Sequence, residues 1–282
     1  MKKKIESPYN CSQATILQEY EIYEILKKRK QKKSSVSKDI PHKLKKEFLP
    51  ELAKPISYIF NSISENGIYP KQWLTEFVTP IPKVSPPEIE DDLRNISLTA
   101  DLSKNYEYIL AEWLKPYIMK RMNPGQCGDL NRHSTTHYLI MLYNFILSNT
   151  DSSSIRRSVI AALIDFSKAF KQINHSKVIV GLSDWGVPRW LLKILVSYLS
   201  GRSMILRYKW ANSLRHLMPV GSPQGTLLGV LIYLVYVSNI GMDLPEIATT
   251  APGTIDIPLV GYPPQPALQN LKLDWNLLMI CL

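Results

Sequence analysis

Residues 159–174 read VIAALIDFSKAFKQIN, and this stretch decides the fold of the 282-residue chain. It opens with an uninterrupted apolar run, Val159–Ile164, and reaches a single carboxylate at Asp165 before polar residues turn the chain. A short apolar run of this kind is typical of a buried strand, which would hold the acid at its end on a rigid element. Taken alone, Asp165 is either a cap for the following turn or helix, or one ligand of a metal site.

A second distinctive stretch lies further along the chain. Residues 220–237 read VGSPQGTLLGVLIYLVYV. The glycine- and proline-rich start predicts a tight loop, in which a ligand can approach the main chain closely. The apolar run that follows, Leu227–Val237, is too short to span a bilayer and predicts a buried helix.

Together the two stretches resemble the palm of reverse transcriptases, most closely those of jockey-like non-LTR retrotransposons. The first stretch is similar to the family motif LDFSKAFD, and the second to GxPQGSxLGPxLF. The resemblance implies RNA-directed DNA polymerisation, with Mg2+ as cofactor and dNTPs as substrates. It also implies an α+β fold of the right-hand polymerase type, with fingers, a partial palm and a small antiparallel sheet packed with helices.

The resemblance also assigns roles to residues of the two motifs. Asp165 would ligate metal with help from the Phe166 carbonyl, because hard cations prefer oxygen ligands. Phe170 would stack under the incoming sugar and exclude a 2′-hydroxyl, although an aromatic ring at this position is equally suited to a hydrophobic core. Gln224 and Gly225 would contact the template base and the dNTP.

Two cations upstream of these motifs match the family as well. Residues 77–83 read FVTPIPK, in which the prolines forbid a helix, and residues 93–99 read LRNISLT, similar to the family's LRPISLT. In the family the basic pair, here Lys83 and Arg94, lies over the triphosphate. Arg grips phosphate oxygens in a fork there, and Lys acts as a point charge. Without the resemblance, both residues are surface cations near a turn.

Positive charge is concentrated in the part of the chain that carries the motifs. The formal charge is +10, and residues 151–220 hold eleven Lys or Arg against three acids, whereas residues 241–282 hold one Lys against four acids. Such a field suits a polyanionic partner, here an RNA template and a DNA primer, although cations also keep a surface soluble. In a predicted strand pair, four cations either face a nucleic-acid backbone or form a solvated face: Arg202, Arg207, Lys209 and Arg215.

The remaining sequence predicts mainly helices in a modular order. Residues 1–47 are expected to form a basic helical extension, whose block at 27–33 is a nucleic-acid arm, a nuclear import signal or a solvated helix end. We expect a fingers-like region at 48–157, a partial palm at 158–240 and an unrelated or degenerate tail at 241–282. Helical periodicity covers residues 44–66, 102–122, 136–147, 175–182 and 190–199.

Cysteine usage and hydropathy indicate the compartment. The three cysteines match neither a disulfide framework nor a zinc-ligand spacing, which fits a reducing environment. No apolar signal-peptide core follows the basic N-terminus. We therefore expect an intracellular protein, in the cytoplasm or the nucleus and away from membranes, and the sequence leaves its oligomeric state open.

The resemblance also implies a later hairpin, Tyr/Phe-x-Asp-Asp, whose adjacent acids complete a two-metal site. No consecutive pair of acids of this kind follows Asp91-Asp92, and Trp275 stands beside Asp274, where a second acid would be required. Two-metal chemistry needs several converging carboxylates. We therefore expect a chain truncated before this hairpin and inactive as a polymerase. Only Asp256 or Asp274 placed beside Asp165 would overturn that expectation.

Two alternatives stay open at this point. In the first, the chain is a non-catalytic protein that binds RNA or DNA. In the second, it is the unstable product of a decayed element.

Overall fold

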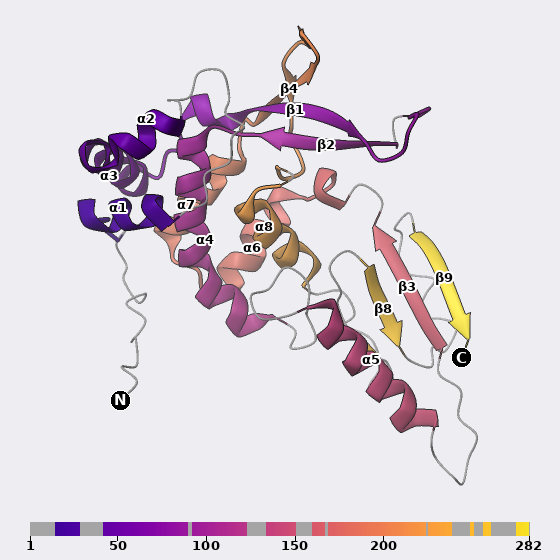
Figure 1. Ribbon diagram of the computed structural model, residues 1–282. Coiled ribbons are helices and arrows are strands. Elements are labelled where there is room, and N and C mark those ends of the chain that lie inside the picture. The colour runs from indigo at the N-terminus through magenta and orange to yellow at the C-terminus, as the bar shows by residue number, and fades with distance from the viewer. Residues whose placement is uncertain are drawn as a thin grey trace. The chain divides into compact units, whose positions relative to one another are not determined.

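The computed structural model places the described residues in two compact units (Figure 1). Unit 1 comprises Met1–Lys120 and Phe170–Tyr236, and unit 2 comprises Arg121–Ala169 and Val237–Leu282. The structure describes residues 15–28, 42–89, 92–122, 134–150, 160–166, 169–223, 225–238, 249–250, 256–260 and 275–281. Most of the basic block predicted at 27–33 lies outside these ranges, as does Gln224.

Unit 1 is mainly helical, and its helices begin and end where the sequence carries the expected signals. The helix predicted at 44–66 is formed as two segments, and it stops at Gly67, whose left-handed φ of 65° lets its N–H donate to Ile63 O at 2.8 Å. Pro188 precedes another helix, where its missing N–H is not needed. The helices are α1 (Glu19–Lys28), α2 (His42–Glu47), α3 (Leu49–Asn66), α4 (Asp101–Arg121), α6 (His175–Asp184), α7 (Arg189–Leu199) and α8 (Leu227–Val237).

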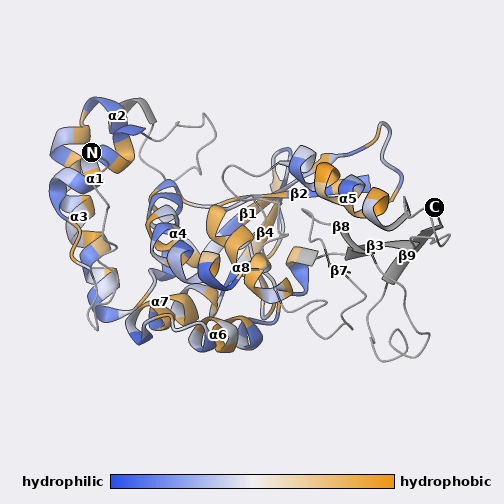
Figure 2. Ribbon diagram, turned by 90° about the horizontal axis from the view of Figure 1, so that it is seen from below, coloured by the Kyte–Doolittle hydropathy of each residue, from blue (hydrophilic) through white to orange (hydrophobic). Residues whose placement is uncertain are grey.

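Aromatic side chains hold the helices of unit 1 together. The rings of Phe60 and Tyr106 lie 5.0 Å apart between α3 and α4, and Tyr69 packs edge-on against Tyr198 of α7, also at 5.0 Å. The Tyr106 hydroxyl lies 2.8 Å from Ser64 Oγ, so it is paired although buried. Apolar residues dominate α8 on all sides (Figure 2), and most of them are buried, which confirms the buried helix that the sequence predicts.

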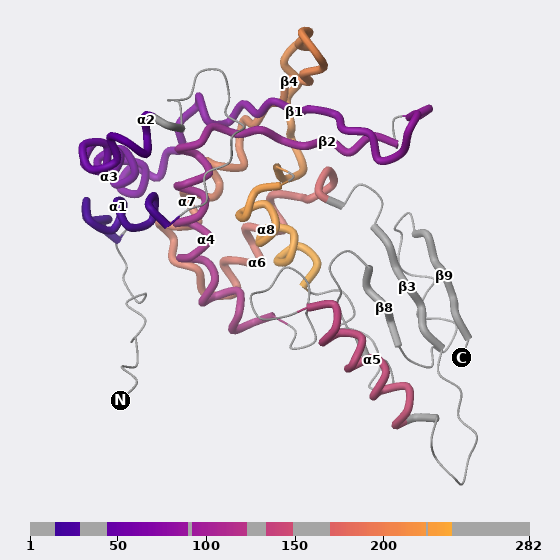
Figure 3. The backbone as a smooth tube through the Cα atoms, in the orientation of Figure 1, coloured from indigo at the N-terminus to yellow at the C-terminus, as the bar shows by residue number. Residues whose placement is uncertain are grey.

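A mixed sheet crosses unit 1. Strand β1 (Thr75–Pro82) pairs antiparallel with β2 (Leu93–Leu98) and parallel with β4 (Ser203–Tyr208), which comes from the second half of the chain (Figure 3). The expectation of an antiparallel sheet is therefore wrong for this sheet. Parallel strands need a long crossover connection, and the helices between β1 and β4 provide one. Two short strands pair antiparallel with β4: β5 (Ala211–Asn212) and β6 (His216–Leu217).

Unit 2 contains the strand that the apolar run Val159–Ile164 predicts. The predicted strand forms as β3 (Ile160–Phe166), and it pairs antiparallel with β8 (Asp256–Val260) on one side and with β9 (Trp275–Cys281) on the other. Short strand β7 (Thr249–Thr250) completes the sheet, and α5 (Thr135–Thr150) covers the predicted helix at 136–147. Residues of the 241–282 tail thus pair with both edges of β3.

The structure matches the expected fold class at the level of α+β, with helices predominating. No helix in the described part of the chain combines the length and hydropathy that a membrane span requires.

Candidate functional site

The glycine-rich loop before α8 is fixed to the segment that begins at Phe170. Ser222 N donates to Phe170 O at 2.8 Å, and Gly221 N donates to Ile173 O at 2.9 Å. His175 Nε2 lies 2.6 Å from Gly221 O on the same side. The structure thereby joins the end of the first sequence motif to the start of the second.

Two glycines of this loop are required by its geometry. Gly221 has a φ of 92°, and a Cβ there would lie 2.9 Å from Phe170 O and 3.0 Å from Lys171 O. Gly229, in the first turn of α8, would place a Cβ against Pro223 O. The Thr226 hydroxyl accepts from Gly229 N at 3.0 Å and so caps the helix.

Among the predicted loop residues, Phe170 and Gly225 can be placed. The Phe170 ring is half-buried and stacks on Tyr233 of α8, with centroids 5.0 Å apart and an interplanar angle of 30°. Gly225 has a φ of 93°, and no atom of the described residues, apart from its chain neighbours, lies within 4 Å of the position a Cβ would take. The ring is therefore held at the edge of the loop, while main chain at Gly225 stays open. Their roles toward sugar and template stay predictions.

The predicted phosphate cations lie on the β1–β2 ribbon. Ile81 pairs with Arg94 in the ribbon, and Lys83 N donates to Asp92 O at 2.7 Å just beyond it. Because strand residues alternate between faces, Lys83 shares a face with its diagonal neighbour Arg94. Both side chains are exposed. The register therefore places the two cations near one another along the ribbon, and their role toward a triphosphate stays a prediction.

Asp92, the second acid of the pair Asp91-Asp92, serves the loop that joins the strands of this ribbon. Asp92 Oδ2 accepts from Glu88 N at 2.9 Å and from Ile89 N at 3.2 Å. These main-chain donors, with a smaller contribution from Lys83, lower the pKa of the Asp92 carboxyl. Asp92 therefore closes the loop as an ionised acceptor.

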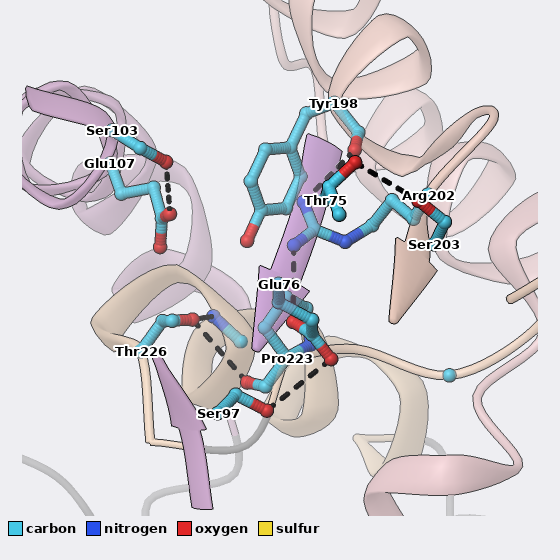
Figure 4. A network of polar contacts seen from close by, with 12 residues as sticks. Thr75, Glu76, Ser97, Ser103, Glu107, Tyr198, Arg202, Ser203, Pro223 and Thr226 are labelled. Atoms are coloured by element: carbon cyan, nitrogen blue, oxygen red, sulfur yellow. Dashed lines mark hydrogen bonds and ion pairs between the residues drawn. The ribbon is translucent and has the colours of Figure 1, made fainter. Parts of the chain in front are cut away.

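A buried ion pair lies at the junction of β1 and β4 (Figure 4). Arg202 is 1% exposed, and its Nη2 lies 3.3 Å from Glu76 Oε2, while its Nη1 donates to Tyr198 O at 3.4 Å. Its guanidinium carbon also lies 4.7 Å from the centroid of the Tyr198 ring. The prediction that Arg202 faces a nucleic-acid backbone is therefore wrong, since its charge is used inside the protein.

Glu107 of α4 is a second buried acid of this network. Its Oε1 accepts from Ser103 Oγ at 3.0 Å, and in Figure 4 its carboxyl points toward the Tyr198 hydroxyl. Burial raises the pKa of Glu107, against smaller opposing effects of Arg202, Ser103 and Thr226. Burial also raises the pKa of Glu76, but the direct ion pair with Arg202 opposes it there. The direct ion pair therefore favours the ionised form of Glu76 more than that of Glu107.

This network links four parts of unit 1 beneath the glycine-rich loop: α4, β1, the α7–β4 junction and the start of α8. Sequence reasoning missed Glu76 and Glu107. A signal was present for Glu107, because it falls on the same helical face as Ser103 and Leu110, which are buried. Glu76 carries no such signal, since its partner Arg202 is remote in sequence.

In unit 2, the strand register gives Asp165 an acidic neighbour. Asp165 pairs with Asp256 of β8 on one side and with Asn276 of β9 on the other. Residues directly opposite in an antiparallel pair share a face of the sheet. Asp256 is thus in register with Asp165, whereas Asp274 lies outside the described residues. Among side chains that the structure describes, no three or more His, Cys, Asp or Glu gather as a metal site would need.

Comparisons with known proteins agree with the motifs. Residues 81–262 match the family described as "Reverse transcriptase (RNA-dependent DNA polymerase)". The chain is 30% identical over 188 residues to "Probable RNA-directed DNA polymerase from transposon BS" of Drosophila melanogaster, which covers 66% of this chain and 20% of that protein. It is 25% identical over 193 residues to "RNA-directed DNA polymerase from mobile element jockey" of the same species, with coverages of 67% and 21%.

Among solved structures, a similar one is the apo telomerase from Candida Tropicalis truncated from its C-terminal domain. The TM-score is 0.52 at 10% sequence identity, over 80% of this chain and 55% of the telomerase chain. At this identity the likeness shows a shared fold alone. The chain spans about a fifth of the length of the curated relatives it matches. The family match includes the β1–β2 ribbon from Ile81, β3, the glycine-rich loop and β8, so this chain belongs to the reverse transcriptase (RNA-dependent DNA polymerase) family, related to polymerases of non-LTR retrotransposons.

Proposed function

We propose that this chain forms the fingers and part of the palm of a non-LTR reverse transcriptase, and that it binds dNTP, RNA template and DNA primer. The family activity is RNA-directed DNA polymerisation. We further propose that the 282-residue polypeptide does not polymerise by itself. The observation that supports this second part is that Asp92, which belongs to the last consecutive Asp pair of the sequence, is bonded to the main chain of its own loop.

Among the described strands of unit 2, Asp165 and Asp256 are the acids in register that could contribute to an Mg2+ site. Mg2+ is held in many proteins by one or two carboxylates together with substrate phosphates, so a pair of acids in register fits a single ion. When bound, the ion would neutralise phosphate charge. A second ion that stabilises the leaving oxygen requires further carboxylates, and the sequence holds no consecutive Asp pair after Asp92.

Unit 1 supplies the groups that would bind substrates. Lys83 and Arg94 lie on one face of the ribbon and would grip phosphate oxygens. Gly225 leaves main chain open to a base or nucleotide, and Phe170 is held beside the same loop by Tyr233. None of these side chains transfers a proton, so the role of unit 1 is to bind and orient.

Nucleotide binding tests this proposal directly. We expect a labelled dNTP to bind the parent chain with Mg2+ present, and Lys83→Ala/Arg94→Ala to weaken it about tenfold or more, since each phosphate contact carries a charge. Lys54→Ala, which removes an exposed cation of α3, is the matched control. Equal affinity of the parent and the double variant would contradict the assignment.

A second candidate function is nucleic-acid binding without any nucleotide site. The absence of Asp and Glu between Asp184 and Asp243 favours it, because this part of the chain carries six Lys or Arg. It predicts RNA binding that weakens steeply with salt, together with no measurable binding of dNTP.

A further inference from the structure

The hairpin formed by β4 and β5 carries large exposed aromatic residues at its tip. Tyr208 pairs with Ala211, which leaves Lys209 and Trp210 as a two-residue loop. The relative exposure of Trp210 is 101%, and that of Tyr208 is 58%. A tryptophan gains much free energy by burial, so one held fully in solvent at a loop tip indicates a surface that meets a partner.

The tip is built as a closed hairpin. Ser213 N donates to Leu206 O at 2.8 Å, Leu206 N donates to Ser213 Oγ at 3.0 Å, and Arg207 Nε donates to Asn212 Oδ1 at 3.3 Å. Lys209 has a φ of 52°, a left-handed conformation in which two-residue hairpin loops usually place Gly, Asn or Asp. A cation therefore occupies a strained position beside Trp210.

Positive charge is interleaved with the aromatic rings. Lys209 Nζ lies 5.5 Å from the centroid of the Tyr208 ring, and the guanidinium carbon of Arg207 lies 4.1 Å from the centroid of the Phe77 ring. No Asp or Glu occurs anywhere from Trp185 to Met242. A partner that stacks on rings and carries negative charge is complementary to this tip, and nucleic acid has both properties.

We propose that the hairpin tip, Tyr208–Trp210, is a stacking platform for the unpaired bases of single-stranded RNA or DNA. Trp210 stacks on a base, and Lys209 contacts the adjacent phosphate. The site prefers single strands, because bases inside a duplex present no free face to a ring. The inference rests on the proposed nucleic-acid partner, yet it depends on neither the nucleotide site nor polymerisation.

Titration of fluorescently labelled oligonucleotides tests the platform. The affinities for an unstructured single-stranded RNA and for a blunt RNA duplex of the same sequence are compared across one series of salt concentrations. Trp210→Ala is expected to weaken single-strand binding on the order of tenfold and leave duplex binding nearly unchanged, and Trp210→Phe to keep most of the affinity. Lys209→Ala is expected to reduce the slope of log affinity against log salt by about one.

A matched control removes a similar pair of side chains elsewhere. Lys54 and Tyr58 lie one turn apart on α3, and both are exposed, Tyr58 at 77%. The variant Lys54→Ala/Tyr58→Ala should bind both oligonucleotides as the parent does. Far-ultraviolet circular dichroism of each variant verifies that the chain is folded.

Each outcome decides the inference. If Trp210→Ala binds the single strand as tightly as the parent, the platform is refuted while the proposed function stands. If Trp210→Ala loses the same affinity for the single strand as for the duplex, base stacking is refuted, and the tip binds nucleic acid through its charge alone. If the parent binds neither oligonucleotide at low salt, both the platform and the proposed function fail, and the tip is a surface for a protein partner.

Discussion

Unit 1 and unit 2 differ in how they hold their acids. In unit 1, Glu76 and Glu107 share Arg202 inside a network that joins two helices, two strands and the loop before α8. In unit 2, Asp165 lies on strand β3 and is in register with one acid, Asp256 of β8. The first arrangement uses carboxylates to hold helices and strands together, and the second pairs two acids across neighbouring strands. The acids of unit 1 therefore stabilise the fold, whereas those of β3 and β8 are the ones that the proposed metal chemistry would use.

The largest effect is expected from breaking the buried ion pair. Arg202→Met leaves Glu76 buried without its cation, and we expect the free energy of unfolding to fall by about 3–5 kcal/mol. Arg202→Met/Glu76→Leu replaces both charges by apolar groups and should recover much of that loss. Urea denaturation followed by circular dichroism measures both variants. A small change in the free energy of unfolding for Arg202→Met would mean that the ion-pair network contributes little to the stability of unit 1.

A smaller loss is expected in the glycine-rich loop. Gly221→Ala adds a Cβ against Phe170 O and Lys171 O at a φ of 92°, so both contact and backbone strain destabilise it. We expect a loss of about 2–3 kcal/mol. Gly186→Ala is the control, because Gly186 has a φ of 81° but no atom within 4 Å of its Cβ position. In thermal unfolding, the melting temperature of Gly221→Ala should be clearly lower than that of Gly186→Ala. Equal melting temperatures would show that the close contact of the added Cβ does not destabilise the loop.

Protonation of Glu107 predicts a pH dependence of stability. Burial raises the pKa of this carboxyl above its ordinary value of 4.5, so at a pH between the unfolded-state and folded-state values the folded chain binds more protons than the unfolded chain. Stability from this group is complete below pH 4.5 and is lost as the pH rises through the folded-state pKa, by up to about 1.4 kcal/mol per pH unit.

Glu107→Gln keeps the shape of the side chain without the titration. Its free energy of unfolding should depend less on pH than that of the parent. Relative to the parent, the stability of the variant should therefore increase as the pH rises. Glu51→Gln, at an exposed position of α3, should follow the parent curve. Parallel curves for all three proteins would show that Glu107 is ionised in the folded chain.

These contrasts also show what the sequence could predict. Elements with local signals are predicted correctly: the β3 strand, the buried α8 helix and the end of α3 at Gly67 are visible in the sequence because neighbouring residues determine them. Arg202 was misassigned to a nucleic-acid surface. Its partner Glu76 is 126 residues away in sequence, and only parallel pairing of β1 with β4 brings the two together. The register of Asp165 with Asp256 has the same origin, since pairing of remote strands is set by the whole fold.

The smallest effect is expected from the lone motif acid. Asp165→Asn should leave the affinity for a primed RNA template within about twofold of the parent, because cations supply most of the binding to phosphates. Lys83→Ala/Arg94→Ala, measured in the same filter-binding assay, provides a variant that should weaken binding. A strong loss in Asp165→Asn would mean that metal at this acid takes part in nucleic-acid binding.

Primer extension tests the central claim most directly. The purified 282-residue polypeptide is incubated with an RNA template, an annealed DNA primer, Mg2+ and labelled dNTPs, beside Asp165→Asn and Asp256→Asn. We predict that the parent yields no more extended primer than either variant, although it binds the primed template. Extension by the parent that either substitution abolishes would contradict the account and make the β3–β8 acids a working metal site.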